Sequence, residues 1–191
     1  MFIEEIGRHL AVSSISELDQ SLKLDKGFWN IISIREPLVS EPRFLAFARR
    51  YHVVICEDSE QDNLNSCSRP PRREDVIGIF EFVDACPAEP ILVHCLAGLS
   101  RSPAVALALL VRGMVQGGWS VTKTSPLVER SAELLLRVRR KARPNALFLR
   151  LCLEQFLSPV EADDLTRQLI NHPSLMENRF ANQSRPQIPE T

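Results

Sequence analysis

The residues with the clearest chemical potential lie in the nine-residue segment 94–102, HCLAGLSRS. Cys95 is a strong nucleophile once it is ionised. Arg101 follows it in a Cys-x5-Arg spacing and carries a planar guanidinium that can bind two phosphate oxygens at once. Gly98 permits a loop conformation that a side chain would hinder. A short apolar strand before the loop and a helix after it would turn backbone N–H groups toward an anion, so we expect a phosphate-binding loop around a reactive thiolate.

The segment resembles the HCxxGxxR[ST] signature of the cysteine-dependent protein tyrosine phosphatases, and it is most similar to the dual-specificity branch and its bacterial relatives. The resemblance covers roughly residues 3–157. It implies that Cys95 is the nucleophile and that Arg101 holds the phosphate. The loop that binds phosphate would comprise Leu96, Ala97, Gly98, Leu99, Ser100 and Arg101. A structural cysteine beside a surface arginine is the alternative, and it leaves the glycine and the strand-to-helix context unexplained.

Two neighbours of the loop have a structural interpretation beside the functional one. The resemblance implies that the Ser102 hydroxyl bonds to the cysteine sulfur and assists its departure from phosphorus, whereas serine also commonly caps helix N-termini. His94 would be a buried auxiliary residue that positions the thiolate and helps to keep it ionised. Its alternative is an ordinary hydrogen-bonded core histidine.

A phosphatase of this kind also needs an acid that protonates the leaving group and then activates water. In the resembling family this acid is an aspartate upstream of the cysteine, at the end of the preceding strand. Asp58 stands just after the strand expected at 51–56, in the string DSEQDNL, which looks like the acid loop of dual-specificity enzymes. Asp62 is the second candidate, and a solvated loop carboxylate is the alternative interpretation of both.

The surrounding elements indicate an α/β layer fold, with a central, mostly parallel sheet flanked by helices. Strands are expected at 2–6, 10–13, 30–34, 51–56 and 91–93. Helices are expected at 16–22, 42–50, 72–85, 103–111, 126–142 and 146–157. Residues 1–158 would form the phosphatase domain. Residues 159–191 would hold one short helix, opened by the capping box of Ser158 and Glu161, and then a flexible tail from Asn171.

Composition limits the function classes. A net charge of −1 and a pI of about 6.4 give no global field for nucleic acid or anionic membranes. The five cysteines include no CxxC pair, which argues against a zinc site or a disulfide scaffold and suits a reducing cytosol. The longest apolar run, 103–111, is far shorter than the roughly 20 residues of a membrane span. We therefore expect a cytoplasmic protein without metal or other cofactor.

These observations predict a phosphomonoester hydrolase that works through a thiophosphoryl-cysteine intermediate and acts on phosphorylated protein, with phosphotyrosine first and phosphoserine or phosphothreonine also open. One alternative is a phosphate-binding pseudophosphatase that lacks the acid. Another is a phosphatase for a phosphoinositide, a nucleotide or an RNA 5′ end. The lysines typical of inositol-lipid enzymes are absent at Leu96, Ala97 and Leu99, which disfavours a multiply phosphorylated lipid.

Two further features are less specific. Arg137, Arg139, Arg140, Lys141 and Arg143 cluster near the end of an expected helix, where cations complement the helix dipole, and a substrate role is the less favoured interpretation. Cys56 could trap an oxidised Cys95 as a disulfide, as a second cysteine does in some members of the resembling family, although a strand cysteine is more often plain core.

Overall fold

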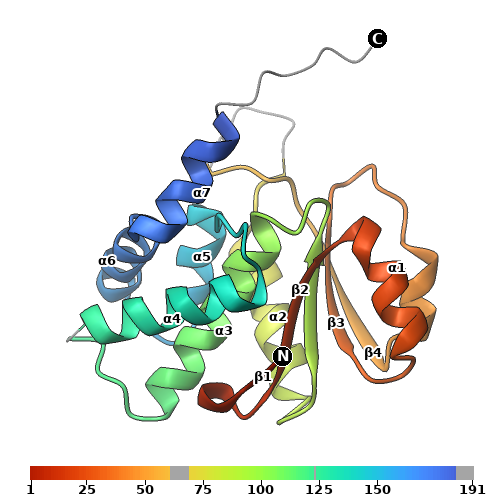
Figure 1. The fold of residues 1–191 in the computed structure, drawn as a ribbon, viewed down its shortest axis with the longest axis horizontal. Helices are drawn as coiled ribbons and strands as arrows, with labels where there is room; N and C mark the ends of the chain where they lie inside the picture. The colour runs from red at the N-terminus through yellow and green to blue at the C-terminus, as the bar shows by residue number, and fades with distance from the viewer. Residues whose placement is uncertain (61–68, 123, 184–191) are drawn as a thin grey trace.

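The computed structural model describes residues 1–60, 69–122 and 124–183. Its centre is a five-stranded sheet in the order β1-β2-β5-β3-β4 (Figure 1). The strands are β1 Phe2–Ile3, β2 Arg8–Ser14, β3 Asn30–Arg35, β4 Arg50–Ile55 and β5 Ile91–Cys95. Strands β2 to β5 are paired in parallel, and the short β1 lies antiparallel to β2 at one edge. The predicted α/β class with a mostly parallel sheet is confirmed.

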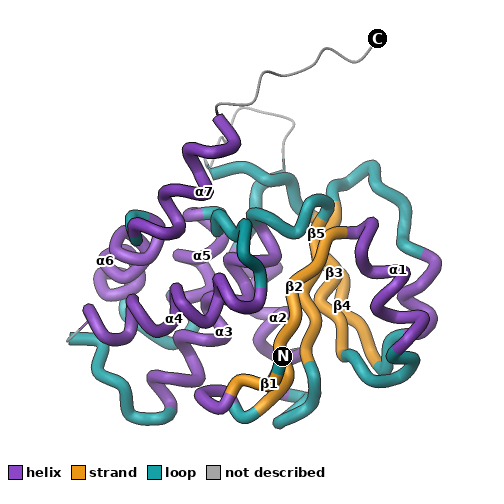
Figure 2. The backbone as a smooth tube through the Cα atoms, viewed as in Figure 1, coloured by secondary structure: helices purple, strands orange, loops and turns teal. Residues whose placement is uncertain are grey.

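Helices cover both faces of this sheet (Figure 2). They are α1 Ile15–Leu24, α2 Arg73–Asp84, α3 Arg101–Gln116, α4 Thr124–Val138, α5 Ala146–Leu153, α6 Pro159–Ile170 and α7 Pro173–Gln183. Helix α1 covers one face, where Leu18 and Leu22 pack with Ile31 of β3. The other helices gather beyond the opposite face and share the larger core. None of the helices in the described ranges is both long enough and apolar enough to cross a bilayer.

Helix α3 is the central helix of the larger core. Its residues from Arg101 to Val111 are all buried, because the sheet covers one side while α4 and α5 pack on others. A helix that is apolar all round requires such complete coverage. The element that follows the phosphate loop is therefore held rigidly in place.

Four expected helices differ clearly in extent. The helix expected at 146–157, α5, ends at Leu153. The segment expected as a helix at 42–50 contains a 3-10 helix at Arg43–Phe47, and β4 already begins at Arg50. Helix α4 ends at Val138 rather than at residue 142, because the chain turns there toward the phosphate loop. Helix α3 begins at Arg101 and its N-cap residue is Ser100, so Ser102 lies inside the helix and does not cap it.

The C-terminal segment is more ordered than expected. Ser158 and Glu161 form the predicted capping box at the start of α6. Fraying was expected from Asn171, whereas α7 begins at Pro173 and buries Leu175 in the main core. The polar residues of α7 hid this helix because its buried face is narrow. Residues 184–191 of the expected tail lie outside the described residues.

Candidate active site

The site forms where β5 ends and α3 begins. Cys95 is the last residue of β5, and its side chain sits at the base of the loop with only 2% of its surface exposed. Its sulfur accepts hydrogen bonds from the Gly98 backbone N–H at 3.2 Å and from the Ser102 hydroxyl at 3.1 Å. Two donors directed at one sulfur suit a negative charge on it. The structure thus brings Cys95, Gly98 and Ser102 together as the sequence predicted.

The loop 96–100 is folded with its carbonyls turned outward. Residues outside the loop donate to every one of these oxygens: Ile15 N–H to Leu96, the Arg139 side chain to Ala97 and Gly98, Arg143 N–H to Leu99, and Asn145 N–H to Ser100. In a planar trans peptide the C=O and the following N–H point in opposite directions. The amides of residues 97–101 therefore face the inside of the loop, where they form a nest for an anion beside the N-terminus of α3.

Gly98 occupies a position in the loop where a side chain does not fit. Its φ is +67°, and an added Cβ would lie 2.6 Å from the backbone carbonyl carbon and oxygen of Ser13 and from the Ser14 nitrogen. The positive φ disfavours any residue with a side chain, and the β2 backbone already occupies the space that a Cβ would need. The glycine of the motif is thereby explained by conformation and by contact.

An ion pair between Glu17 of α1 and Arg139, the residue after α4, holds the loop from outside. Arg139, just beyond α4, donates to the carbonyls of Ala97 at 3.1 Å and Gly98 at 3.0 Å. The same guanidinium pairs with Glu17 at 2.8 Å, and Glu17 accepts from the Ser14 N–H at 2.8 Å. Burial raises the pKa of Glu17, but hydrogen bonds from Ser14 and Arg139 outweigh it and hold that pKa below its usual value. Arg139, a member of the basic cluster, thus supports the site by holding the loop in place.

Arg101 is buried with 2% of its side chain exposed. Its Nη1 donates to the Cys56 carbonyl at 2.6 Å and its Nη2 to Glu36 at 3.0 Å. Glu36 directly follows β3, the neighbour of β5 in the sheet. The Nε has no hydrogen-bond partner within the described ranges. Since a guanidinium has five N–H groups, donors remain free for phosphate while the side chain stays fixed.

Asp58 lies beside the loop, as its position after β4 predicted. Its Oδ1 accepts from the Ser100 hydroxyl at 2.7 Å and from the Asn145 amide at 2.9 Å. Its Oδ2 is 3.9 Å from the Arg101 Nε. A carboxyl group at this place is within reach of a phosphate ester bound in the loop. Asp62, the second candidate, lies outside the described residues.

Asn145 joins three parts of the site. Its side chain caps α5 by accepting from the Phe148 N–H at 2.9 Å, while its amide donates to Asp58 and to the Ser59 carbonyl. Its backbone N–H donates to the Ser100 carbonyl at 3.2 Å. Because one buried residue links the acid segment and α5 through its side chain and the loop through its backbone, it restricts where the Asp58 carboxyl can lie.

The two remaining sequence candidates are buried next to the loop. His94 lies on β5, and its burial, together with the positive charge of Arg35, lowers its pKa to about 4. The imidazole is therefore neutral near pH 7 and can act on Cys95 through position but not through charge. Burial raises the pKa of Cys56 to about 12, which disfavours the thiolate that disulfide formation requires. The proposed redox role of Cys56 stays a prediction.

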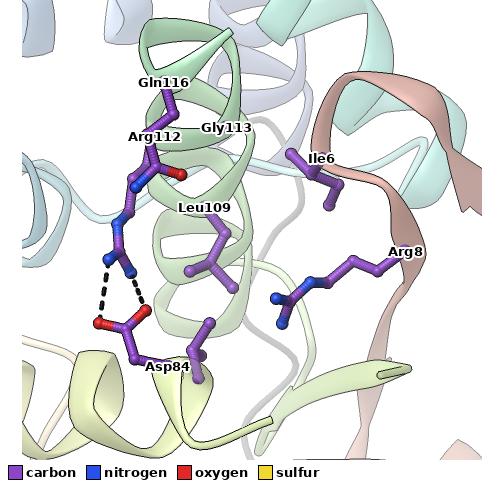
Figure 3. A pocket seen from close by; sticks show the side chains of 8 residues that line it. Ile6, Arg8, Asp84, Leu109, Arg112, Gly113 and Gln116 are labelled. Carbon is purple, nitrogen blue, oxygen red and sulfur yellow. Dashed lines mark hydrogen bonds and ion pairs between the residues drawn. The ribbon is translucent and has the colours of Figure 1, made fainter. Parts of the chain in front are cut away.

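Within the described ranges, no group of three His, Cys, Asp or Glu side chains could hold a metal ion. A cavity of about 70 Å³ lies near the far end of α3, where Arg112 pairs with Asp84 at 2.8 Å and Arg8 points inward (Figure 3). Arg112 is eleven residues beyond Arg101, roughly 16 Å along a helix that rises 1.5 Å per residue. This cavity is separate from the phosphate loop.

Sequence reasoning missed several residues that shape the site. Glu36, Glu17 and Asn145 belong to no recognisable motif, although Glu36 stands at the carboxyl end of a parallel strand, where ligands of such sheets bind. The Ser100 hydroxyl was expected to contribute little beyond its backbone, yet it donates to Asp58. Only the fold shows which of the clustered arginines reaches the loop.

No protein-family model matches the chain, and no curated protein matches its sequence. Among solved structures, the human tyrosine phosphatase-like serine/threonine/tyrosine-interacting protein is 24% identical over 76% of this chain and 89% of its own, with a TM-score of 0.53. The Yvh1 phosphatase domain from Chaetomium thermophilum is 20% identical over 77% and 89%, with a TM-score of 0.54. PTPMT1, solved in complex with PI(5)P, is 15% identical over 84% and 94%, with a TM-score of 0.51. The chain therefore has the fold of the dual-specificity, cysteine-dependent tyrosine phosphatases.

Proposed function

We propose that the chain is a cysteine-dependent phosphomonoester hydrolase that acts on phosphorylated protein, with phosphotyrosine as the leading substrate. The observation that carries the proposal is the closed set of contacts around Cys95. Its sulfur receives two hydrogen bonds, the loop carbonyls are fixed outward, and the Arg101 guanidinium lies 3.9 Å from the Asp58 carboxylate. A cysteine with a purely structural role would need none of these.

In the first step the Cys95 thiolate attacks phosphorus and the bond from phosphorus to the ester oxygen breaks. The phosphoryl oxygens lie among the loop amides and the free donors of Arg101, which stabilise the charge of the transition state. Asp58 donates its proton to the leaving oxygen, so the alcohol or phenol departs neutral. The products of this step are the free alcohol, a thiophosphoryl cysteine and an ionised Asp58.

In the second step water attacks the same phosphorus and the S–P bond breaks. Asp58 takes a proton from that water, and the electron pair of the broken bond returns to sulfur. The Ser102 hydroxyl, 3.1 Å from the sulfur, stabilises the returning thiolate. Inorganic phosphate leaves and the starting state is restored. No metal ion is needed in this sequence.

A phosphate-binding protein without turnover is the second candidate function. One of the similar structures is described as tyrosine phosphatase-like rather than as a phosphatase. In the present chain, Asp58 is held at the loop by Ser100 and Asn145, which favours turnover. A lipid headgroup with several phosphates is disfavoured by the apolar Leu96 and Ala97, which are exposed on the loop, because such a headgroup would need cations there.

Hydrolysis of an aryl phosphate tests the proposal. We expect metal-independent turnover that is unchanged by EDTA. Arg101→Lys should lose most of it, since a point charge cannot reproduce the fork that contacts phosphate, Glu36 and the Cys56 carbonyl together. Wild-type protein that binds phosphate or vanadate but does not turn over would support the binding function instead. A requirement for a metal ion would contradict the mechanism.

A further inference from the structure

The cleft beside the phosphate loop has polar walls. A cavity of about 330 Å³ is lined by Asp58, Glu60, Ser100, Arg143 and Arg179. Asp58 and Ser100 already belong to the proposed site, so the cavity opens next to the position of the substrate phosphate. All five of these side chains are charged or carry a hydroxyl group. A polar or charged part of the substrate fits there better than hydrocarbon, which would leave those groups unsolvated.

Arg143 differs from the other arginines around this opening. Arg101, Arg139 and Arg179 each pair with a carboxylate. The side chain of Arg143 has neither an ion pair nor a hydrogen bond to any described residue, and its Nε is buried. Its backbone N–H donates to the Leu99 carbonyl at 2.8 Å, which fixes the residue next to the loop whatever its side chain does. The cleft thus holds a guanidinium that is paired with neither of the two lining carboxylates, Asp58 and Glu60, on a backbone that is fixed beside the loop.

We propose that Arg143 is a specificity-determining residue that binds a second anionic group of the substrate. The inference rests on the proposed phosphatase function and names its substrate class: a phosphotyrosine peptide with a carboxylate or a second phosphate close to the phosphotyrosine. A charge-assisted contact between guanidinium and carboxylate or phosphate provides the recognition. The exposed apolar side chains of Leu96 and Ala97 on the loop fit the hydrocarbon parts of a peptide.

The test is a set of phosphotyrosine peptides in which one flanking position at a time carries Ala, Glu or phosphoserine. We expect kcat/KM of the wild type to be about 5- to 10-fold higher for the best acidic peptide than for its Ala counterpart, which is the net contribution of a single hydrogen bond at a solvated site. The ratio should fall to about 1 in Arg143→Ala and survive in large part in Arg143→Lys. It should also shrink as salt is added. Comparison of Glu with phosphoserine identifies the source of the anion.

Arg140→Ala is the matched control, because Arg140 is an exposed cation in the same segment that does not line the cavity. A ratio of two substrates in one variant cancels any loss of folded protein. The inference is overturned if Arg143→Ala keeps the wild-type ratio or if Arg140→Ala lowers it equally. Faster turnover of a soluble inositol polyphosphate than of every peptide would also overturn it.

Absence of turnover on every phosphoester is a failure of the proposed function and not of this inference. In that case the same peptides are titrated into the Cys95→Ser variant with and without Arg143→Ala, with fluorescence anisotropy as the readout. Loss of the acidic preference on removal of Arg143 supports the binding role. Equal affinities in the two proteins refute it.

Discussion

Replacement of Asp58 by asparagine removes the proton that the proposed first step requires and changes little else. The amide oxygen can still accept from Ser100 and Asn145, which now donate to Oδ1 at 2.7 and 2.9 Å. The lost attraction to Arg101 spans 3.9 Å and involves a side chain that is 37% exposed, so its loss costs less than about 1 kcal/mol of stability. The fold and the phosphate loop should therefore survive the substitution.

The expected loss of activity is much larger. General acid catalysis contributes about 10²- to 10⁴-fold, which corresponds to about 3–5 kcal/mol of transition-state stabilisation at 1.36 kcal/mol per factor of ten. The assay is kcat for a series of aryl phosphates whose leaving groups differ in basicity. The loss should be full for a poor leaving group and should shrink for one that departs without a proton. The alkaline limb of the pH–rate profile should flatten.

Asp62→Asn is the matched control, since it makes the same charge change four residues away. If Asp62→Asn shows the large loss and the altered pH limb while Asp58→Asn behaves like the wild type, the assignment of the acid is wrong. If both variants keep full activity on a poor leaving group, the acid lies elsewhere.

Three further predictions concern the support of the loop and the buried histidine. Gly98→Ala should lower the free energy of unfolding in urea by about 2–4 kcal/mol and abolish phosphate binding, because its Cβ would meet the backbone of β2. The control is Gly7→Ala, where φ is +61° but nothing lies within 4 Å of the added Cβ, so it should cost only about 1 kcal/mol. Equal losses of stability in the two variants would exclude the clash at Gly98. Arg139→Met should reduce kcat about 10²-fold, the scale of an ångström-sized misplacement, and Glu17→Gln should reduce kcat by less. A pH profile that keeps the shape of the wild type would show that only positioning is affected. Full activity in Arg139→Met would show that the ion pair does not hold the loop in its active form. The pKa of His94 is lowered to about 4 in the folded protein from about 6.5 in the unfolded chain, so its contribution to stability is complete above pH 6.5 and is lost as the pH falls toward 4. The free energy of unfolding should therefore fall by about 2 kcal/mol between pH 7 and pH 5. An imidazole that titrates near pH 6.5 by NMR in the folded protein would refute this.

The sequence predicted the parts of the site that follow from one short segment. The Cys95-to-Arg101 loop, its strand and its helix depend on local order along the chain, and so does the place of Asp58 after β4. Partners such as Glu36 and Glu17 could not be predicted, because each meets the loop only through the strand order β2-β5-β3. The spacing of strands along the sequence does not show which parallel strands are neighbours in the sheet. The residues around a surface glutamate likewise do not show which side chain it contacts.

The ends of the helices and strands likewise include some that the sequence predicted well and some that it did not. Alternating and helical patterns placed β3, α1 and α2 to within one or two residues. The end of α4 was missed because helical periodicity continues past Val138, whereas in the structure Arg139 turns to bond the loop. Helix α7 was missed because its packing on α6 stabilises a segment whose own composition is polar. In both cases tertiary contacts override the local pattern.

The proposed mechanism depends on a covalent bond between phosphorus and the Cys95 sulfur, and the mass of the protein during turnover tests for that bond. Rapidly mixed enzyme and aryl phosphate are quenched in alkaline denaturant, and the phosphorylated residue is located by mass spectrometry. Because Ser102 assists the departure of the thiolate in the proposed mechanism, Ser102→Ala should accumulate more of the intermediate than the wild type. We expect one added phosphoryl group on Cys95, and none in Cys95→Ser. Turnover that persists in Cys95→Ser, or a phosphoryl group found on another residue, would contradict it.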